Sequence, residues 1–368
     1  MPAEPKPDET QAARDIAVVT PVFGGAFSIA YDAATALSNL GHRVTFLDMR
    51  IFADAHRIAR TAGTPAAQQH FFSLTAEHIL RHVLAARCEI LFALALAPVR
   101  APLLQRLKAH GVTTAMWHVE QHERFDTWRH SAHHYDFFFR IQEAPFATLL
   151  DAAAVPHHSY LPVAASSAPQ PEHTQARPQA SHCPLVFFGS PYENRFALLQ
   201  SVADRGLSLW GQGWSDVPEP LASCVRSGDT YLDGETEAQV YKRADIVLNP
   251  HSVGAQETTR DFLNPRLFTL AARGHFQLTD ARSLLRRHFT ADEVIAYEST
   301  ADLQNKVDYF LAHPEARQRI ATAAQRRALR DHTYEHRMTT MLEHIAEQGS
   351  ARPDATDTPG ADLSPRSH

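Results

Sequence analysis

The segment Ala244–Asp280 constrains the fold most, because it holds a strand, a loop, a helix and a second strand in that order. Residues Ile246–Leu248 form a continuous apolar run, which is typical of a parallel strand buried on both faces. In Pro265–Ala272 the apolar residues recur at helical spacing, and Gly274 predicts the end of that helix. The segment therefore predicts an α/β protein with a parallel sheet.

The same strand and helix pattern recurs along the chain and predicts two Rossmann-like domains. Near the start, a strand over 16–20 precedes a helix over 27–40 and a strand over 44–47, which together make a right-handed βαβ unit. A stretch rich in Pro, Ser, Ala and Gln predicts a linker between the domains. The predicted order is a disordered lead-in over 1–14, an N-terminal domain over 15–163, the linker over 164–183, a C-terminal domain over 184–332, a helix over 333–348 that can cross back to the first domain, and a disordered tail over 349–368.

Composition and charge narrow the possible functions. With 368 residues, 44% of them hydrophobic, the chain can bury two ordinary cores. A formal net charge of -6 argues against a nucleic-acid partner bound over a wide basic face. Three widely spaced cysteines exclude a disulfide framework, and no apolar run reaches the length of a membrane span. We therefore expect a cytoplasmic protein without a transmembrane segment or an export signal.

Two loops of the C-terminal domain are predicted to converge on an anion. Gly189 ends one strand and Arg195 follows on the next helical turn, while Asn249, Asn264 and Arg266 border the helix of the 244–280 segment. The carboxyl ends of parallel strands are where open α/β sheets bind ligands, and helix N-termini and guanidinium forks suit phosphates. A surface crossover whose polar groups only cap a helix is the alternative interpretation of each loop taken alone.

A resemblance to a known family rests on the segments FFGSPYENRFALLQSVADRGLSLWGQGW, YLDGETEAQVYKRADIVLNPH, NPRLFTLAARGHFQLTD and DHTYEHRMTTML. They resemble the C-terminal half of the group 1 glycosyl transferases of the spore maturation protein CgeB type, and a looser similarity extends over residues 15–346. The resemblance implies a GT-B fold whose C-terminal domain binds a nucleotide-sugar donor and whose N-terminal domain receives an acceptor. The family's phosphate-contacting arginine falls on Arg195 or Arg266, and its loop asparagines fall on Asn249 and Asn264.

One position departs from the family pattern. Members usually carry R-x-F-E, whose glutamate accepts hydrogen bonds from the nucleotide ribose, whereas this chain has Thr269 at that place. Threonine can still make one hydrogen bond, but it has no charge and a shorter reach. Glu257 and Asp261 are nearby carboxylates that could compensate.

Transfer of a sugar requires positive charge for the departing diphosphate and a base for the acceptor hydroxyl. Arginines can supply the charge without a metal ion or other cofactor, so we expect only the nucleotide-sugar donor and an unidentified acceptor as ligands. His118 and Glu120, which follow the strand over 113–117, are the candidate bases. Gly24 and Gly25 follow the first strand and allow close approach of a ligand to that sheet, although a tight turn without a ligand explains them equally well.

Two other functions compete with this interpretation. The first is a catalytically silent GT-B domain that binds a sugar nucleotide or a protein partner, which the departure at Thr269 motivates. The second is a metal-dependent hydrolase built on the histidines between 118 and 134. The sequence HVEQH in that stretch differs from the zinc motif HExxH in the position of its glutamate, which argues against the second function.

Overall fold

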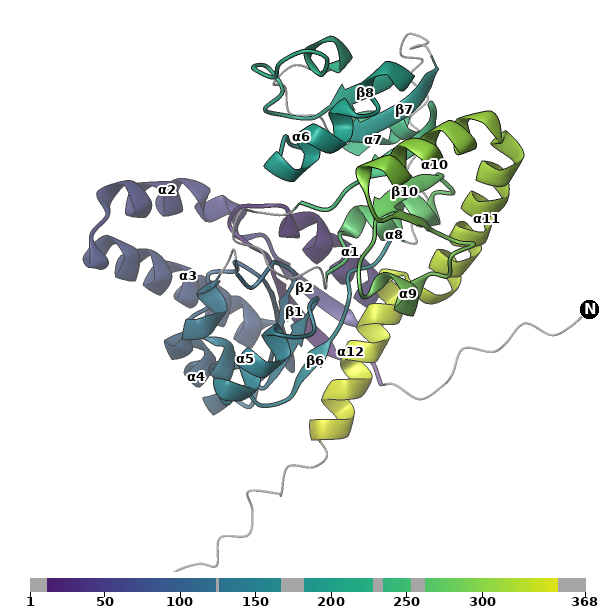
Figure 1. Cartoon of the computed structure of the whole chain (residues 1–368). Coiled ribbons are helices and arrows are strands. Elements are labelled where there is room, and N and C mark those ends of the chain that lie inside the picture. The colour runs from purple at the N-terminus through teal and green to yellow at the C-terminus, as the bar shows by residue number, and fades with distance from the viewer. Residues whose placement is uncertain (1–11, 124–125, 167–181, 228–233, 253–261, 350–368) are drawn as a thin grey trace, which may run out of the picture.

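The computed structural model describes residues 12–123, 126–166, 182–227, 234–252 and 262–349, and their strands form two parallel sheets (Figure 1). This confirms the predicted fold class. Most of the predicted lead-in, linker and tail lies outside the described residues, and so do Glu257 and Asp261. No helix in the described ranges is both long and apolar enough to cross a membrane.

The first sheet has six strands in the order β2-β1-β3-β4-β5-β6, and all neighbouring pairs are parallel. Because the order reverses between β1 and β3, the gap beyond the carboxyl ends of these two strands is a topological switch point. The strands are β1 (Asp15–Val19), β2 (Arg43–Leu47), β3 (Ile90–Leu94), β4 (Thr113–His118), β5 (Phe137–Arg140) and β6 (His158–Tyr160), and the helices are α1 (Ala26–Asn39), α2 (Ala53–Ala62), α3 (Pro65–Ala85), α4 (Ala101–Ala109) and α5 (Phe146–Ala152).

The hairpin of α2 and α3 extends from one side of this domain (Figure 1) and differs from the sequence prediction. The sequence prediction omitted α2, although its sequence is amphipathic, and Ala59 is its one buried residue. From the sequence alone a helix is predicted over 75–86, which covers only the latter part of α3. In the structure α3 begins at Pro65, where the Thr64 hydroxyl oxygen caps the helix by accepting a hydrogen bond from the backbone N–H of Ala67 at 3.2 Å.

The second sheet has five strands in the order β11-β10-β9-β7-β8, again all parallel. Its order reverses between β7 and β9, which creates a second switch point. The strands are β7 (Cys183–Phe188), β8 (Leu207–Trp210), β9 (Ala244–Asn249), β10 (Gln277–Asp280) and β11 (Ile295–Tyr297), and the helices are α6 (Glu193–Gln200), α7 (Gly234–Tyr241), α8 (Pro265–Ala272), α9 (Leu285–His288), α10 (Thr300–Ala312) and α11 (Pro314–Asp331).

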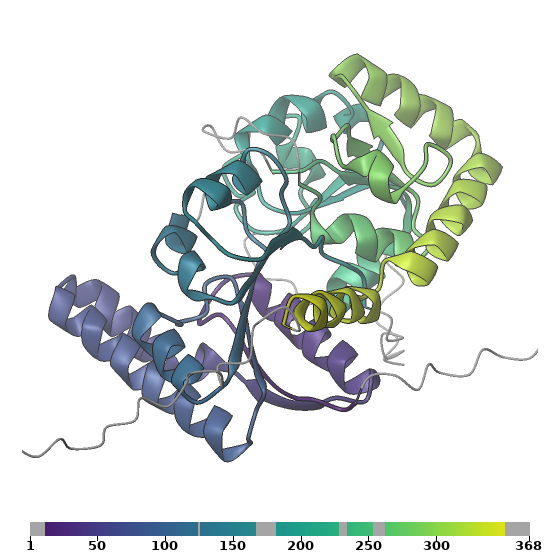
Figure 2. The same ribbon diagram turned by 90° about the horizontal axis from the view of Figure 1, so that it is seen from below.

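The last helix, α12 (Tyr334–Gly349), returns to the first domain and lies against α1 (Figure 2). Arg337 at its start donates a hydrogen bond from Nε to the carbonyl oxygen of Pro162 at 2.9 Å. A single apolar core contains Val18 of β1, Phe268 of α8 and Met338 of α12, all fully buried. Shared burial therefore holds the two sheets, and both switch points, in one arrangement.

Candidate functional site

The switch point of the second sheet lies between the loop after β7 and the loop after β9. Gly189 is the first residue beyond β7, and its φ of +153° is one that residues with side chains rarely adopt. A Cβ atom there would lie 3.0 Å from the ring of Phe187 and 3.4 Å from Nη1 of Arg195. Glycine is therefore required for Arg195 to lie against this part of the backbone.

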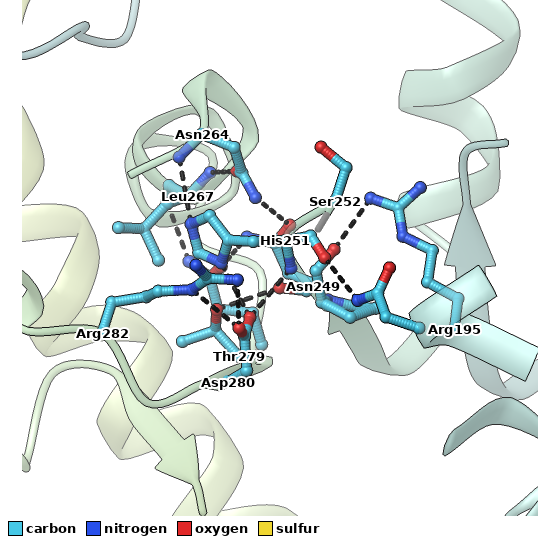
Figure 3. Close-up of polar contacts among 12 residues, drawn as sticks. Arg195, Asn249, His251, Ser252, Asn264, Leu267, Thr279, Asp280 and Arg282 are labelled. Carbon is cyan, nitrogen blue, oxygen red and sulfur yellow. Dashed lines mark hydrogen bonds and ion pairs between the residues drawn. The ribbon is translucent and has the colours of Figure 1, made fainter. Parts of the chain in front are cut away.

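Arg195, on the first turn of α6, connects the two loops (Figure 3). Its Nη1 donates to the carbonyl oxygen of Ser190 at 2.8 Å, and its Nη2 donates to the carbonyl oxygen of Pro250 at 2.9 Å. The guanidinium also lies over the rings of Phe187 and Tyr192, at 5.1 and 4.9 Å from their centroids. Nε is buried and has no hydrogen-bond partner within the described residues. Arg195 thus orders both sides of the switch point and retains one unused donor.

Arg266 brings a second positive charge to the same place. It lies on the first turn of α8, its side chain is 23% exposed, and its Nε is 3.9 Å from Oε1 of Glu237 without a hydrogen bond to any described residue. Burial, followed by the charge of Arg266, lowers the pKa of Arg195 to about 10, so the Arg195 guanidinium remains charged at neutral pH. Two neighbouring cations of this kind favour the binding of an anion.

Buried Asn249 and partly buried Asn264 form a chain of amide hydrogen bonds at the start of α8 (Figure 3). The Oδ1 atom of Asn264 caps the helix by accepting from the N–H of Leu267 at 2.9 Å, and its Nδ2 donates to Oδ1 of Asn249 at 3.1 Å. Nδ2 of Asn249 in turn donates to Oε1 of Gln277 at 3.0 Å. Contact of either asparagine with the donor stays a prediction, and both side chains already hold α8 against β9 and β10.

Thr269, the position that departs from the family pattern, lies one turn after Arg266 on α8. Its hydroxyl donates to the carbonyl oxygen of Pro265 at 3.2 Å, within its own helix. This bond satisfies the hydroxyl locally, as is common for threonine inside helices. The predicted contact of Thr269 with the donor remains a prediction.

Buried His251, in the loop after β9, and buried Arg282 both bond to the partly buried Asp280 at the end of β10 (Figure 3). Oδ1 of Asp280 accepts from the backbone N–H of His251 at 2.8 Å and from its Nδ1 at 2.7 Å, while Nε2 of His251 accepts from the N–H of Asn264 at 3.0 Å. Nε of Arg282 donates to Oδ2 of Asp280 at 2.7 Å. These bonds require a neutral His251 that carries its proton on Nδ1, and they connect the ends of β9 and β10 to the start of α8.

In the first domain the two glycines after β1 have different roles. Gly24 has a φ of +95°, so it needs glycine to make its turn, and a Cβ there would approach Leu96 to 3.6 Å. Gly25 has an ordinary helical φ of -73° and forms the N-cap of α1. Its backbone therefore gives no reason for a glycine, and of the two predicted cleft glycines only Gly24 has a conformation that demands one.

His118, a predicted base, ends β4 and is only 2% exposed. Burial, followed by the nearby His122, lowers the pKa of His118 to about 3. A base with so low a pKa takes up protons poorly at neutral pH, so a neutral imidazole that forms hydrogen bonds fits this position better than a general base. Glu120, the other predicted base, lies two residues further on in the loop and is partly buried.

The loop after β4 reaches across to the second domain. Nε2 of Gln121 donates to the carbonyl oxygen of Ser252 at 3.4 Å. Ser252 belongs to the loop after β9 that Arg195 also contacts, so the carboxyl ends of the two sheets face each other in this region. Groups bound at the two switch points would therefore lie at facing edges of the two sheets.

Comparison with known proteins agrees with this geometry. Residues 195–343 match the model of the family described as glycosyl transferase-like, and the match runs from Arg195 through α8 into α12. The chain is 29% identical over 157 residues to the spore protein CgeB of Bacillus subtilis (strain 168), which is 39% of this chain and 47% of the relative. The chain thus matches about half the length of this curated relative. Over this part of the chain the sequence is similar to glycosyl transferase-like proteins and to CgeB.

Solved structures extend the likeness in fold to most of the chain. A glycosyltransferase from Rickettsia africae ESF-5 superposes with a TM-score of 0.59 at 11% identity and covers 92% of this chain and 99% of its own. Sucrose-phosphate synthase from Thermosynechococcus elongatus gives 0.58 at 11%, covering 92% and 100%. The E. coli trehalose-6-phosphate structure bound with UDP-2-fluoro glucose gives 0.57 at 10%, covering 90% and 99%. These likenesses show that the fold is GT-B.

Among the histidines between 118 and 134, His118 and His122 are buried and pack against aromatic rings. The ring of His122 stacks on Phe146 at 4.8 Å, and both its backbone N–H and its Nδ1 lie within 3.1 Å of Oε1 of Gln142. Within the described ranges no group of three or more His, Cys, Asp or Glu side chains is placed to hold a metal ion.

The sequence patterns did not single out His251, Asp280, Arg282 and Gln121 as site residues. His251 and Asp280 do carry a sequence signal, because each lies at the carboxyl end of a predicted parallel strand, next to an apolar run. Arg282 and Gln121 carry none, since their importance depends on partners in other elements.

Proposed function

We propose that this chain is a metal-independent glycosyltransferase that binds a nucleotide sugar at the switch point of its second sheet. The observation that carries the proposal is the pairing of Arg195 and Arg266, two positive charges at the carboxyl edge of a parallel sheet. A nucleoside diphosphate supplies an anion at the place where open α/β sheets bind ligands. The bound UDP-2-fluoro glucose in the E. coli structural neighbour supports a nucleotide sugar as the donor class.

The arginines fit the bond that must break. When the bond between the anomeric carbon and the diphosphate oxygen breaks, its electron pair and the negative charge go to the diphosphate. Arg266 is partly exposed and has an unused Nε, so it is the group that contacts this diphosphate. Arg195 is more deeply buried than Arg266, adds a second positive charge, and holds the loops in position through Ser190 and Pro250.

The acceptor molecule binds in the first domain and presents its hydroxyl group to the donor. Its oxygen forms the new bond to the anomeric carbon, and Glu120 takes its proton, because carboxylates in such loops can act as general bases. Neutral His118 hydrogen-bonds the same hydroxyl and orients it. The contact between Gln121 and Ser252 brings this loop to the donor loop.

A nucleotide screen tests the proposal. Purified protein is titrated by calorimetry with UDP, GDP, CDP and dTDP, each in magnesium and in EDTA, and the matching sugar nucleotides are then assayed for hydrolysis. We expect one diphosphate to bind with the same affinity in both buffers, and its sugar form to be hydrolysed slowly without an acceptor. Binding that requires magnesium contradicts metal independence, binding with no turnover of any sugar form contradicts the enzyme, and no binding at all removes the donor site.

A further inference from the structure

A cavity lies at the switch point of the first sheet, opposite the donor site. It is formed by residues after β1, after β3 and at the end of β4, including Val22, Leu96, Val99 and His118. Its volume is about 150 Å³. A cavity of this size in another protein accepts a single benzene ring. Both the place and the size therefore suit a small ligand held beside the cleft.

The wall of the cavity is mostly apolar and aromatic. Phe71, Phe138 and Trp128 are at most 4% exposed and line it together with Phe72. Phe23 lines it as well, is 45% exposed and stacks on His56 at 4.9 Å, which identifies the open side. The polar side chains that line it are His56, Arg100, His118 and Ser131, so a sugar with several hydroxyl groups would find few partners there, whereas an aromatic ring needs none.

One polar atom inside this wall lacks a partner. Nε2 of His118 is buried and makes no hydrogen bond within the described structure, although its ring packs against Phe138 at 5.9 Å and Phe146 at 5.4 Å. Buried polar atoms are normally paired, so an unpaired one in a cavity indicates a missing ligand group. Leu96, which also lines the cavity, has a φ of +66°, and such strain in a residue with a side chain is typical of ligand sites.

We propose that this cavity holds the ring of a phenolic acceptor, whose hydroxyl bonds Nε2 of His118. The inference rests on the proposed function and names the acceptor class for it. The phenolic oxygen forms the bond to the anomeric carbon, the bond from that carbon to the diphosphate breaks with its electron pair on the diphosphate, and the phenolic proton passes to Glu120. One ring and one hydroxyl match one aromatic cavity and one unpaired nitrogen.

Binding of simple probes tests the cavity without any nucleotide. Phenol, toluene and glucose are titrated into the full-length protein and followed by calorimetry and ligand-observed NMR. Phenol should bind, toluene should bind about 2- to 12-fold more weakly because it lacks the hydrogen bond, and glucose should not bind. In His118→Leu the preference for phenol over toluene should disappear while toluene still binds. This variant should fold, because it replaces an unpaired buried polar group with an apolar one.

A filled cavity gives a second test. Ala97, partly exposed, lines the cavity, so Ala97→Phe should weaken phenol binding at least tenfold. Ala86→Phe, at an exposed position after α3, is the matched control and should bind phenol normally. Absence of phenol binding, equal binding of glucose, or normal binding in Ala97→Phe overturns the proposal.

The acceptor role is separated from the donor proposal by the final assay. Phenol and the sugar nucleotide identified in the screen should together yield a phenyl glycoside. Hydrolysis of the donor without phenyl glycoside overturns the phenolic acceptor and leaves the glycosyltransferase proposal standing. Phenol binding in a protein that binds no nucleotide overturns the glycosyltransferase proposal, and the acceptor role falls with it.

Discussion

Substitution of Asp280 by asparagine should destabilise the second domain strongly. In the folded protein the carboxylate accepts hydrogen bonds from His251 through Oδ1 and from Arg282 through Oδ2, and the side chain of Arg282 is fully buried. Asparagine has the same shape, but it is neutral, and its N–H₂ group would face either the His251 donors or the Arg282 donor. A buried guanidinium without its counter-charge costs about 3–5 kcal/mol, and we expect a loss of that size at pH 7.

The loss should depend on pH in a defined direction. Burial alone would raise the pKa of Asp280, but the hydrogen bonds from neutral His251 and the charge of Arg282 outweigh it and hold the pKa well below its usual range. A carboxyl with a lowered folded pKa contributes stability above the unfolded pKa of about 3.9 and loses it as the pH falls towards the folded pKa. The difference between wild type and variant should thus be constant from pH 7 to about pH 5 and shrink below about pH 4.

Urea unfolding followed by tryptophan fluorescence measures this difference at each pH. The matched control is Asp308→Asn, which removes an exposed ion pair with Arg205 and should change stability by less than about 1 kcal/mol. If Asp280→Asn unfolds at the same urea concentration as wild type at pH 7, the buried ion pair does not stabilise the domain and the reasoning fails.

Four further substitutions have defined outcomes. Arg266→Ala should weaken binding of the nucleoside diphosphate by about 1.5–3 kcal/mol in titration calorimetry, because it removes a hydrogen bond to a charged group. Glu120→Gln should lower kcat in a transferase assay with little change in donor affinity, because the base acts only in the chemical step. Met341→Ala should lower the free energy of unfolding by about 2–5 kcal/mol in urea, since the side chain is fully buried between α12 and the first domain. Burial raises the pKa of Asp32 on α1 to about 6. Asp32→Asn should therefore raise the free energy of unfolding by about 1–3 kcal/mol at pH 7, and this gain should vanish as the pH falls to about 4.

Each substitution has a control or a contrary result that distinguishes its specific effect from a general loss of folding or activity. Arg319→Ala, on the exposed side of α11, should leave nucleotide affinity unchanged, and equal affinity in Arg266→Ala would remove that residue from the site. Equal turnover in Glu120→Gln would exclude it as the base. Glu343→Ala, exposed on α12, should unfold like wild type, and the same result for Met341→Ala would mean that the helix is not anchored by its apolar face. A pH-independent difference for Asp32→Asn would contradict the raised pKa.

Local sequence patterns determined the two-domain fold. The continuous apolar runs of β7 and β9 specify buried parallel strands wherever they occur, and the Asn264 cap with Pro265 fixes the start of α8 through neighbours in the chain. Local sequence patterns also place Arg195 and Arg266 on the first turns of helices that follow strands. Because strand order then brings those turns to one edge of a sheet, the convergence of the two arginines could be predicted.

Only the tertiary structure decided what the remaining polar groups do. Asn249 looked available for a ligand, yet its amide is bonded to Gln277 and Asn264, which come from other elements. His118 was a credible base by sequence, but burial lowers its pKa to about 3, and burial depends on packing that the sequence around it does not reveal. The buried ion pair of Asp280 with Arg282, the aromatic cavity and the return of α12 to α1 likewise depend on which distant surfaces meet. Hydrogen-bond partners and local dielectric are properties of the assembled interior, so a chain pattern that specifies strands and helices does not specify them.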